Sequence, residues 1–593
     1  MKNWRLRNNK VNIEKMADAL RISPVMAQVL ANRGIGTFET AKKFIAPSLE
    51  DMYDGYLFED MKKGIDLLNE AIDAGTKISV YGDYDADGVM SSVILYKSIK
   101  CFTNNVMYYV PHRQKEGYGI NCDSINELYI EGVRLIICCD NGITALKEAE
   151  FMKQLGMRFI ILDHHEPSFV ETENGRNDVL PSADAIIDHK KKTCTYPVKN
   201  LCAGGMSYKF SQLLFESRNA EFSYRDEFLV FAAIATICDI VDLLDENRTI
   251  AKLGLDSIKY SPNIGLQALI EETGLDKADK ITEYHIGFVI GPCINATGRL
   301  ESAKSAIELF LTEDTQKAKE LSFELTAIND SRKEMTQKAV KECVEMVKND
   351  ESSVLVVYNE NVHESIAGIV AGRIKEKFYK PAIVITSGDE MAKGSARSID
   401  GYNIFEEMFK VKDIFHKFGG HPMAAGLSIA KKNIEELKRR LNENCQLTKE
   451  ELTPVIRIDK ALNINEINMG LAKELLLLAP FGKENTMPLF GTKNMFAEKI
   501  TLIGKDKNII KMSLRDKETG LRLDGIDFNN YTQFVNELNN VFGEEETDQV
   551  LQGLLPVYLD LVYGVSINEF LGRKTVQLII KDFRLMGGNS NGY

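Results

Sequence analysis

The chain has 593 residues, more than one hydrophobic core supports, so three or four domains are expected. Its hydrophobic content of 44% and charged content of 27% are ordinary for a soluble globular protein. The net charge of −13 argues mildly against a nucleic-acid partner, which usually requires a basic surface. No basic-then-apolar leader is present, and no apolar run approaches the roughly 20 residues that span a bilayer, so no membrane association is expected.

Two short basic runs, Lys190–Lys192 and Lys438–Arg440, interrupt this acidic background. Each is predicted to be solvated surface. The ten cysteines contain no C-x-x-C pair, which excludes a zinc ribbon and a thioredoxin-type motif. Cys138 and Cys139 are adjacent in an apolar run, which is typical of reduced thiols, so we expect a cytoplasmic protein.

The first part of the chain, residues 1 to about 60, is predicted to be helical. Ser23-Pro24 is a plausible helix start, and Gly34 and Gly36 are expected to break the helices. Alternating strands and helices are then expected over about 61–250.

Three apolar runs within that alternation end in acidic or imidazole side chains. Lys77–Tyr81 precedes an Asp-rich turn at 82–88, Val133–Cys139 precedes Asp140, and Arg158–Leu162 precedes Asp163-His164-His165. Short β-branched runs of this kind predict parallel strands of a doubly wound sheet. Ligands bind beyond the carboxyl ends of such strands, which is where these polar side chains should lie.

The polar side chains at these strand ends predict a metal-dependent active site. Five carboxylates and two imidazoles at one sheet edge would repel one another unless cations neutralise them. Oxygen and imidazole ligands without thiolates suit manganese and are less natural for magnesium alone. The residues are Asp83, Asp85, Asp87, Asp140, Asp163, His164 and His165.

A further carboxylate, Asp239, lies within the apolar run Phe228–Val241, which predicts a buried helix. A bare buried charge is prohibitively costly, so Asp239 needs a partner. That partner is either an Arg or Lys side chain or a metal ion at the active site.

The second half of the chain predicts two more folded parts. Residues 303–349 have helical spacing and no Pro or Gly, which indicates a long connecting helix. A second α/β unit follows, with strands at Val354–Tyr358 and Ala382–Thr386 around a helix at Ile366–Lys377. After about 450, short alternating strands predict a small β-barrel.

Ten stretches, in order along the chain, carry a resemblance to a known family. They are YGDYDADGVMSS (81–92), PHRQKEGYG (111–119), CDNGI (139–143), LDHHEP (162–167), ATICDIVDL (235–243), GPCINATGRL (291–300), GIVAGRI (368–374), GSARSI (394–399), FGGHPMAAG (418–426) and PFGKENTMPLF (480–490). Together they resemble the RecJ branch of the DHH phosphoesterase superfamily, the single-strand-specific 5′→3′ exonucleases. The resemblance covers nearly the whole chain.

The resemblance implies an α/β fold class with several domains. After the N-terminal helical region (1–60), a doubly wound parallel-sheet DHH domain is expected at 61–302. A long helix at 303–349 would join it to a smaller α/β domain at 350–450, the DHH-associated substrate-binding domain. An OB-like β-barrel that binds nucleic acid is expected at 455–593.

The resemblance also implies roles at the metal site, which would hold two ions of Mn²⁺ or Mg²⁺. Asp85, Asp87, Asp140, His164 and Asp239 are the first-choice ligands, with Asp140 as the bridge. Asp83 and Asp163 are ligands or carboxylates that fix the imidazoles. His165 is expected to meet the substrate phosphate or leaving group, so the catalytic residues would be Asp140, His164 and His165.

Substrate binding is assigned mainly to the second α/β unit, with Asn295 and Arg299 from the end of the first domain. Gly419-Gly420-His421 would let backbone and imidazole approach a phosphate closely, and Ser395, Arg397 and Ser398 would bind a terminal phosphate. The full expected set is Asn295, Arg299, Arg373, Ser395, Arg397, Ser398, Gly419, Gly420 and His421.

Three positions depart from the family pattern. Cys293 stands where an Arg is usual, which would remove one DNA-backbone contact. Tyr81 stands where many relatives have His, so a possible metal ligand is missing. Thr297 replaces a small Ala. None of these changes removes the acidic core of the site.

The expected function is a metal-dependent 5′→3′ exonuclease that degrades single-stranded DNA in repair and recombination, as a monomer. Single-strand-binding protein and a helicase are candidate partners. A second reading is a DHH phosphodiesterase for short RNA or cyclic dinucleotides. The length of the chain and the predicted barrel argue against it, because a small substrate needs no long channel. A third is a non-catalytic replication scaffold of the Cdc45-like branch, but that branch would have lost acidic ligands. Digestion polarity, the choice of DNA or RNA and the preferred metal do not follow from the residues alone.

Overall fold

The computed structural model describes residues 2–9, 11–113, 115–172, 175–388, 391–517, 519–570 and 572–586. Residues 587–593 of the expected barrel domain lie outside this part. The chain forms two compact units. One combines Met1–Ser48 with Val455–Tyr593, and the other is Leu49–Pro454. No helix among the described residues is long and apolar enough to cross a membrane.

The larger unit begins with a five-stranded parallel sheet in the order β3-β2-β4-β5-β8. Its chain order reverses between β2 and β4, which makes that point the topological switch where ligands bind in such sheets. The strands are β2 (Ile78–Tyr81), β3 (Val106–Tyr109), β4 (Leu135–Cys139), β5 (Arg158–Leu162) and β8 (Ala185–Ile187).

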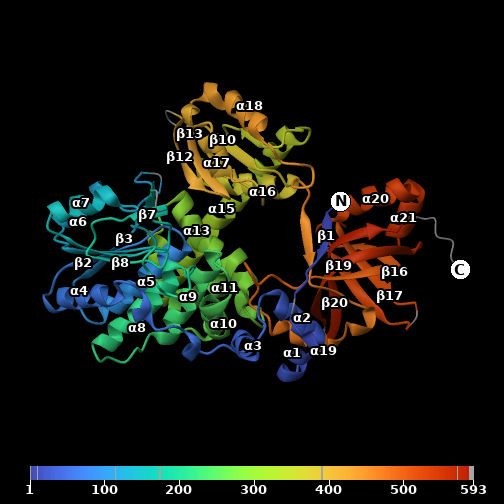
Figure 1. Ribbon diagram of the computed structural model, residues 1–593, viewed down its shortest axis with the longest axis horizontal. Helices are drawn as coiled ribbons and strands as arrows, with labels where there is room; N and C mark the ends of the chain where they lie inside the picture. Colours follow the sequence, from blue (N-terminus) through green and yellow to red (C-terminus); the bar gives the residue numbers. More distant parts are fainter. Residues whose placement is uncertain are drawn as a thin grey trace. The chain divides into compact units, whose positions relative to one another are not determined.

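Helices cover both faces of this sheet, which explains why its central strands are apolar on both sides. Figure 1 shows one group of helices on each side. One group comprises α4 (Met61–Asp73), α5 (Ala86–Lys100) and α8 (Ala203–Ser217), and the other α6 (Cys122–Ile130) and α7 (Leu146–Gln154). The expected doubly wound parallel sheet is confirmed.

A helical layer completes this part of the unit. It contains α9 (Arg225–Cys238), α10 (Asp245–Ser257), α11 (Ile264–Glu272), α12 (Glu283–His285) and α13 (Gly291–Leu300), with a π-helical turn at Ile286–Ile290. Helix α9 packs on α5, α8 and α10, and its core residues are buried. The expected buried helix is therefore present, and Asp239 is the residue at its C-terminal end.

The long connecting helix is shorter than expected. The segment forms α14 (Lys304–Leu311) and then α15 (Thr315–Val347), which are separated at Asp314. The Asp314 side chain accepts hydrogen bonds from the backbone N–H groups of Gln316 and Lys317. This N-cap starts a new helix where composition alone suggested continuity.

A second α/β module follows α15 within the same unit. Its five-stranded mixed sheet has the order β12-β13-β11-β10-β9, with only β9 and β10 parallel. Apolar residues of α15 and α16 pack on one face, and those of α17 and α18 on the other. The elements are β9 (Leu355–Tyr358), α16 (Glu364–Phe378), β10 (Ala382–Thr386), β11 (Ala392–Arg397), α17 (Ile404–Phe409), β12 (Phe415–His421), β13 (Ala424–Ile429) and α18 (Ile434–Asn444).

The smaller unit contains the expected β-barrel. Its strands run in the order β15-β16-β17-β18-β20-β19, and pairing of β16 with β19 closes the sheet. The strands are β15 (Lys460–Ala461), β16 (Phe490–Ile503), β17 (Ile509–Arg515), β18 (Arg522–Asp527), β19 (Val557–Phe570) and β20 (Arg573–Leu585). Helices α19 (Met469–Leu476), α20 (Tyr531–Phe542) and α21 (Glu544–Leu551) accompany them.

The N-terminal segment belongs to the barrel unit. Three short helices are present, α1 (Ile13–Leu20), α2 (Pro24–Asn32) and α3 (Phe38–Ile45), and the Ser23 side chain caps α2 as expected. A strand that the sequence did not suggest, β1 (Asn3–Leu6), pairs in parallel with β14 (Val455–Ile458). The Asn32 side chain also donates to the Asp459 backbone carbonyl at 3.0 Å.

We predict that the buried ion pair between Lys209 and Glu246 is a principal support of the larger unit. The two side chains are 3% and 0% exposed, and Tyr196 also donates to the Glu246 carboxylate. Lys209→Met would leave Glu246 buried without its cation and should cost about 3–5 kcal/mol of unfolding free energy. Denaturant titration measures this loss.

The control variant is Lys62→Met, which removes an exposed pair with Asp66 (75% and 53% exposed). It should change the unfolding free energy by less than about 1 kcal/mol. Equal losses in both variants would contradict the prediction.

Candidate active site

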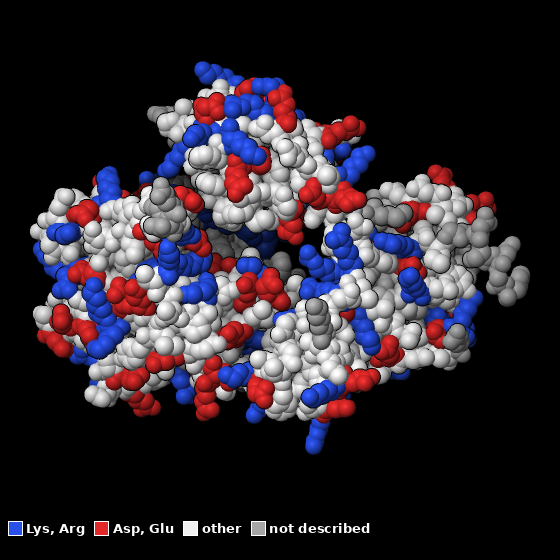
Figure 2. Space-filling view, in the orientation of Figure 1, with Lys and Arg blue, Asp and Glu red and all other residues white. Residues whose placement is uncertain are grey.

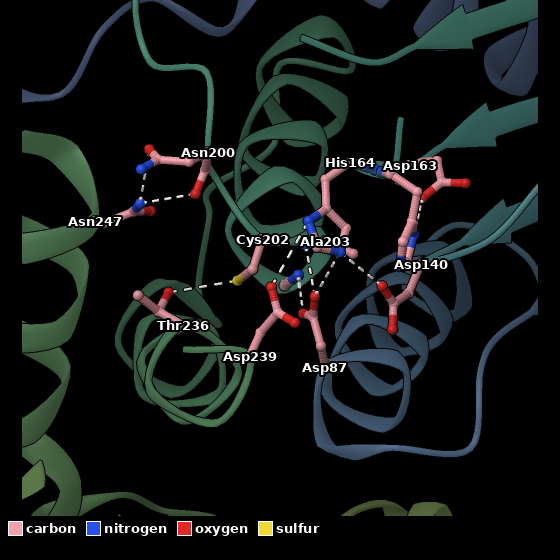
Figure 3. Close-up of polar contacts among 12 residues, drawn as sticks. Asp87, Asp140, Asp163, His164, Asn200, Cys202, Ala203, Thr236, Asp239 and Asn247 are labelled. Atoms are coloured by element: carbon pink, nitrogen blue, oxygen red, sulfur yellow. Dashed lines mark hydrogen bonds and ion pairs between the residues drawn. The ribbon is translucent and has the colours of Figure 1, made fainter. Parts of the chain in front are cut away.

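The side chains at the switch point come from three neighbouring strand ends. Asp83, Asp85 and Asp87 follow β2, Asp140 follows β4, and His164 follows β5. Asp239, at the end of α9, completes the cluster from the helical layer. Figure 3 shows Asp87, Asp140, His164 and Asp239 pointing toward one another.

The backbone at these positions is shaped to present the carboxylates. A Cβ at Gly88 would lie 2.6 Å from the Asp83 carbonyl oxygen, so only glycine allows α5 to start this close to the loop. The Asp85 side chain caps α5 by accepting from the N–H groups of Asp87 and Gly88. Asp140 adopts a left-handed backbone conformation, with φ of 63°, which is unusual outside glycine.

His164 is the centre of the cluster. Its Nε2 lies 3.0 Å from Asp140 Oδ1 and 3.6 Å from Asp87 Oδ2, and its Nδ1 lies 3.7 Å from Asp239 Oδ2. Asp87 is held in turn by the backbone N–H groups of Ala203 and Gly204, at 2.9 and 2.7 Å. These amides lie at the N-terminus of α8, where the helix dipole favours a negative charge.

Three groups of side chains in this cluster have ligand atoms within 4.8 Å of one another. Asp140 and His164 each belong to two groups, so neighbouring groups share residues. Such sharing suits two ions a short distance apart. The groups are Asp83 with Asp85 and Asp140; Asp87 with His164 and Asp239; and Asp140 with His164 and His165.

Burial and mutual repulsion disfavour the ionised form of the carboxylates in this cluster. Burial, and then the charge of Asp85, raise the pKa of Asp87 to about 7. Burial, and then Asp87 and Asp85, raise the pKa of Asp239 to about 8. The pKa values of Asp83 and Asp140 are also raised by burial and by neighbouring carboxylates.

The cluster fits divalent cations. Asp83 Oδ1 is buried and has no hydrogen-bond partner among the described residues, which leaves it available as a ligand. Burial lowers the pKa of His164 well below its ordinary value, so its imidazole is neutral and can coordinate. Oxygen and nitrogen donors without thiolates suit Mn²⁺ best among common ions.

Asp163 lies outside these groups because both of its oxygens are engaged. Oδ1 contacts His165 Nδ1 at 2.7 Å and the His164 backbone N–H at 2.7 Å, and Oδ2 accepts from the Ile143 backbone N–H. Asp163 was expected to be either a metal ligand or a carboxylate that fixes an imidazole, and its contacts match the second role. Although burial alone would lower the pKa of His165, Asp163 raises it to about 9.

Cations from both α/β modules gather beside the acidic cluster. Arg299, on α13, donates to the Ser365 backbone carbonyl on α16 at 3.0 Å, which ties the modules together. Burial and then the charges of Arg113 and Arg332 lower the pKa of Arg299 to about 10. Burial and then Arg113 lower the pKa of Arg397. Asn295, on the same helix as Arg299, accepts from the Ala86 backbone N–H at 2.7 Å.

One of these cations, Arg113, lines a pocket of about 390 Å³ that the two modules share. Arg113 lines it from the first module, and Ser395, Lys393, Lys417 and Gly419 line it from the second module. Figure 2 shows the drawn face hollowed near the second module, with Lys and Arg side chains deep in the hollow. A Cβ at Gly368 would lie 2.8 Å from Arg397 Nη2, so this glycine makes room for the guanidinium.

The other expected substrate residues are placed differently. Ser398 is buried, and its hydroxyl donates to the Tyr402 carbonyl, so it faces away from the pocket. Arg373 is exposed on α16, where it pairs with Glu376 on its own helix. Gly420 and His421 lie at the end of β12, and Gly420 has a φ of 159°.

The departures from the family pattern also have structural explanations. Tyr81 is fully buried, stacks on Tyr109 and contacts the Ser124 hydroxyl at 3.1 Å, so it belongs to the core. Cys293 is buried against α15, where its sulfur accepts from Asn329. Thr297 is buried, and its hydroxyl donates to the Ile294 carbonyl.

Sequence reasoning missed two residues of the site. Tyr118 donates to the Asp140 carbonyl at 3.1 Å and lies near His165. Arg113 stacks over Tyr84 with its guanidinium 5.1 Å from the ring centroid. Both occur in the stretch PHRQKEGYG, which carried the family resemblance but no residue assignment.

We predict that Mn²⁺ stabilises the larger unit because it relieves the repulsion among the buried carboxylates. Saturating Mn²⁺ should raise the midpoint of thermal unfolding by several degrees over protein in chelator. Asp140→Ala should remove most of this rise, since Asp140 belongs to two of the three ligand groups. Differential scanning calorimetry measures both effects.

Asp66→Ala is the matched control, because this exposed carboxylate pairs only at the surface with Lys62. It should respond to Mn²⁺ like the unmodified chain. A full Mn²⁺ response in Asp140→Ala would show that the cluster is not the metal site.

Family models match three parts of the chain. The DHH family N-terminal domain matches residues 77–236, the DHHA1 domain residues 351–447, and the RecJ OB domain residues 458–582. They correspond to the parallel sheet with its first covering helices, the second α/β module and the barrel.

Curated relatives match over almost the full length. The single-stranded-DNA-specific exonuclease RecJ of Bacillus subtilis is 36% identical over 98% of this chain and 70% of its own. The Escherichia coli protein of the same name is 30% identical over 96% of this chain and 97% of its own. The Mn²⁺-bound crystal structure of Thermus thermophilus RecJ superposes with a TM-score of 0.81 at 23% identity, over 98% of this chain and 79% of that one. By its sequence relatives, its domain matches and its fold, this chain belongs to the RecJ family.

Proposed function

We propose that this chain is a metal-dependent exonuclease that degrades single-stranded DNA from the 5′ end and serves DNA repair and recombination. One observation carries the proposal: Arg113 lines the cationic pocket and also lies over Tyr84, in the acidic turn that follows β2, so the pocket adjoins the acidic cluster. A site of this kind can hold metal ions and a phosphorylated chain end together.

The chain's own side chains supply the remaining chemistry. Two divalent ions bound to the cluster would activate a water molecule and stabilise the leaving oxygen of the phosphodiester. Asp83, Asp85, Asp87, Asp140, His164 and Asp239 are the proposed ligands. Asp163 orients His165 through its Nδ1 and raises the pKa of this imidazole to about 9. His165 can therefore donate to a phosphate oxygen or to the leaving 3′ oxygen.

The polarity is proposed from the cationic pocket. A terminal phosphate monoester carries more charge than an internal phosphodiester, so it gains more from Arg113, Arg397 and the Ser395 hydroxyl. Held there, the 5′ end places the next phosphodiester toward the acidic cluster. The retention of every acidic ligand is hard to reconcile with a purely structural scaffold.

We also propose a domain assignment and a cellular setting. The DHH domain would span 61–302 and the substrate-binding domain 350–450, with the barrel of 455–593 holding the strand by backbone charge and base stacking. One chain can supply every proposed ligand, so the proposed monomer needs no residue from a partner. The free, buried thiols of Cys138 and Cys139 fit the cytoplasm, where single-strand-binding protein and a helicase would present the substrate.

We predict that the rate of digestion depends on whether the DNA is single-stranded or duplex. The chain should digest single-stranded DNA from the 5′ end and leave blunt duplex resistant, because terminal phosphate and metal contacts engage one backbone. Matched oligonucleotides of DNA and RNA, labelled at either end and incubated with Mn²⁺, Mg²⁺ or chelator, test this. Equal rates on blunt duplex and single strand, or a preference for 3′ ends, would refute it.

We predict that Arg397 and His421 bind substrate rather than metal. Arg397→Ala and His421→Ala should lower kcat/KM for single-stranded DNA at least tenfold, while the Mn²⁺-induced rise in the unfolding midpoint stays intact. Asp140→Ala, by contrast, should abolish cleavage, because loss of a shared ligand costs several kcal/mol of transition-state stabilisation.

The control is Arg439→Ala, which removes an exposed cation that pairs with Glu436 and Glu443 on its own helix. It should leave kcat/KM unchanged. Loss of the Mn²⁺ response in His421→Ala would contradict the assignment to substrate.

A further inference from the structure

A two-stranded hairpin follows the histidines of the candidate active site. It consists of β6 (Ser168–Thr172) and β7 (Gly175–Val179), which pair only with each other among the described residues. Its first strand begins three residues after His165. A hairpin of two strands has little stability of its own in water, so contacts at its base must hold it.

Polar contacts fix the base of the hairpin to the parallel sheet. The Arg176 guanidinium contacts Glu166 at 3.1 Å and donates to the Pro167 carbonyl at 3.3 Å, in the turn that follows β5. The Lys192 backbone N–H donates to Asp178 Oδ2 at 2.7 Å, and its ammonium donates to the Arg176 carbonyl at 3.0 Å. Because Lys192 lies in the segment after β8, the hairpin is anchored at the same sheet edge as the metal cluster.

Lys192 belongs to the run Lys190–Lys192, for which the sequence predicts solvated surface. The prediction is wrong for Lys191, which is 2% exposed, pairs with Glu59 at 3.1 Å and donates to the Ile186 carbonyl. This buried lysine fixes the segment after β8 to the sheet, and Lys192 extends that support to the hairpin.

Phe169, on β6, is an aromatic ring that the protein covers on one side. It is 50% exposed and lies outside both hydrophobic clusters that cover the parallel sheet. The Arg176 guanidinium lies over the ring, 4.5 Å from its centroid. Since Glu166 and Pro167 hold this guanidinium in place, one ring face is covered, and the exposed area belongs to the other face and to the ring edge.

The ring lies within reach of DNA bound at the metal cluster. Phe169 is four residues beyond His165, so their Cα atoms are at most about 14 Å apart, a span that a few nucleotides of an extended strand cover. None of the described residues that line the pocket beside Arg113 comes from the hairpin. A nucleotide held in that pocket is therefore not the one that meets Phe169.

We propose that Phe169 stacks on a base of the single strand, at one of the first three nucleotides beyond the scissile bond. The assignment rests on the proposed function, since it takes the metal cluster as the site of cleavage and the pocket as the site of the 5′ phosphate. Every base has a π-face, so one ring can hold a strand without selecting its sequence. The bases of a duplex stack on one another and are paired, so this contact also favours single strands.

Phe169→Ala tests the proposal against Val170→Ala. Val170 is the matched control because it is 51% exposed and is the next residue on β6, so its side chain points to the opposite face of the hairpin. Phe169→Ala should lower kcat/KM for 5′-phosphorylated single-stranded DNA about tenfold, as expected for the loss of one stacked base. Phe169→Trp should keep at least the rate of the unmodified chain, and Val170→Ala should equal it.

Salt dependence separates stacking from a phosphate contact. Stacking neutralises no phosphate, so the slope of log kcat/KM against log KCl concentration should be the same in Phe169→Ala as in the unmodified chain. Loss of one phosphate contact on a single strand would instead flatten the slope by about 0.7. The Mn²⁺-induced rise in the unfolding midpoint should also be unchanged, because the ring lies outside the core and the metal cluster.

Abasic sites locate the stacked base. Oligonucleotides carry one abasic site at the second, third or fourth nucleotide from the 5′ end, or at the tenth as a control, and release of the first nucleotide is measured. One of the first three positions should slow the unmodified chain about as much as Phe169→Ala does, and should slow Phe169→Ala no further. The tenth position should have no effect on either chain.

The opposite results overturn the inference. Full activity in Phe169→Ala would leave the ring to a protein partner, and an equal loss in Val170→Ala would indicate general damage to the hairpin. A flattened salt slope, a reduced Mn²⁺ response, or additive losses at all three abasic positions would each exclude stacking. If the unmodified chain cleaves no single-stranded DNA, the proposed function fails and takes this inference with it. If it cleaves DNA and Phe169→Ala is unaffected, only the inference fails.

Discussion

The repulsion among buried carboxylates is the constraint on which this structure depends. Asp83, Asp87, Asp140 and Asp239 converge at a sheet edge where burial raises their pKa values. Burial of several unpaired carboxylates is unfavourable, so the surrounding backbone must hold them in place. The α8 amides that bind Asp87 and the left-handed backbone of Asp140 do so from the protein side. Preorganisation of this kind lowers the cost of arranging the ligands around metal.

Two sets of contacts surround this cluster, one at the adjacent histidines and one between the two α/β modules. The Asp163–His165 pair keeps one imidazole positively charged, while burial keeps His164 neutral. Both imidazoles contact a carboxylate, but Asp163 outweighs burial and raises the pKa of His165, whereas burial and then the charge of His165 lower the pKa of His164. The Arg299–Ser365 hydrogen bond joins the two α/β modules next to the same cluster. Chemistry and substrate binding are therefore coupled through a few short contacts.

Much of the catalytic sheet could be predicted from the sequence, because parallel strands buried on both faces are apolar runs and the polar residues that follow them must share an edge. Asp239 could be singled out because a carboxylate in an apolar helix needs a partner. The substrate-binding side chains of the second module were harder to predict. Ser398 and Arg397 are neighbours in sequence, yet strand alternation turns the Ser398 hydroxyl into the core. Arg113 lies in a loop with no periodicity, so only its tertiary contacts reveal it.

The pairing of β1 with β14 has a consequence for biosynthesis. Strand β1 (Asn3–Leu6) pairs with residues 455–458, so this unit is discontinuous in sequence. During translation the first segment emerges early and must wait, while the intervening unit of about four hundred residues is made and can fold on its own. Closing so long a loop is entropically expensive and slow, since non-local contacts form late. The amino-terminal segment would therefore stay open to chaperones and proteases until the last quarter of the chain leaves the ribosome.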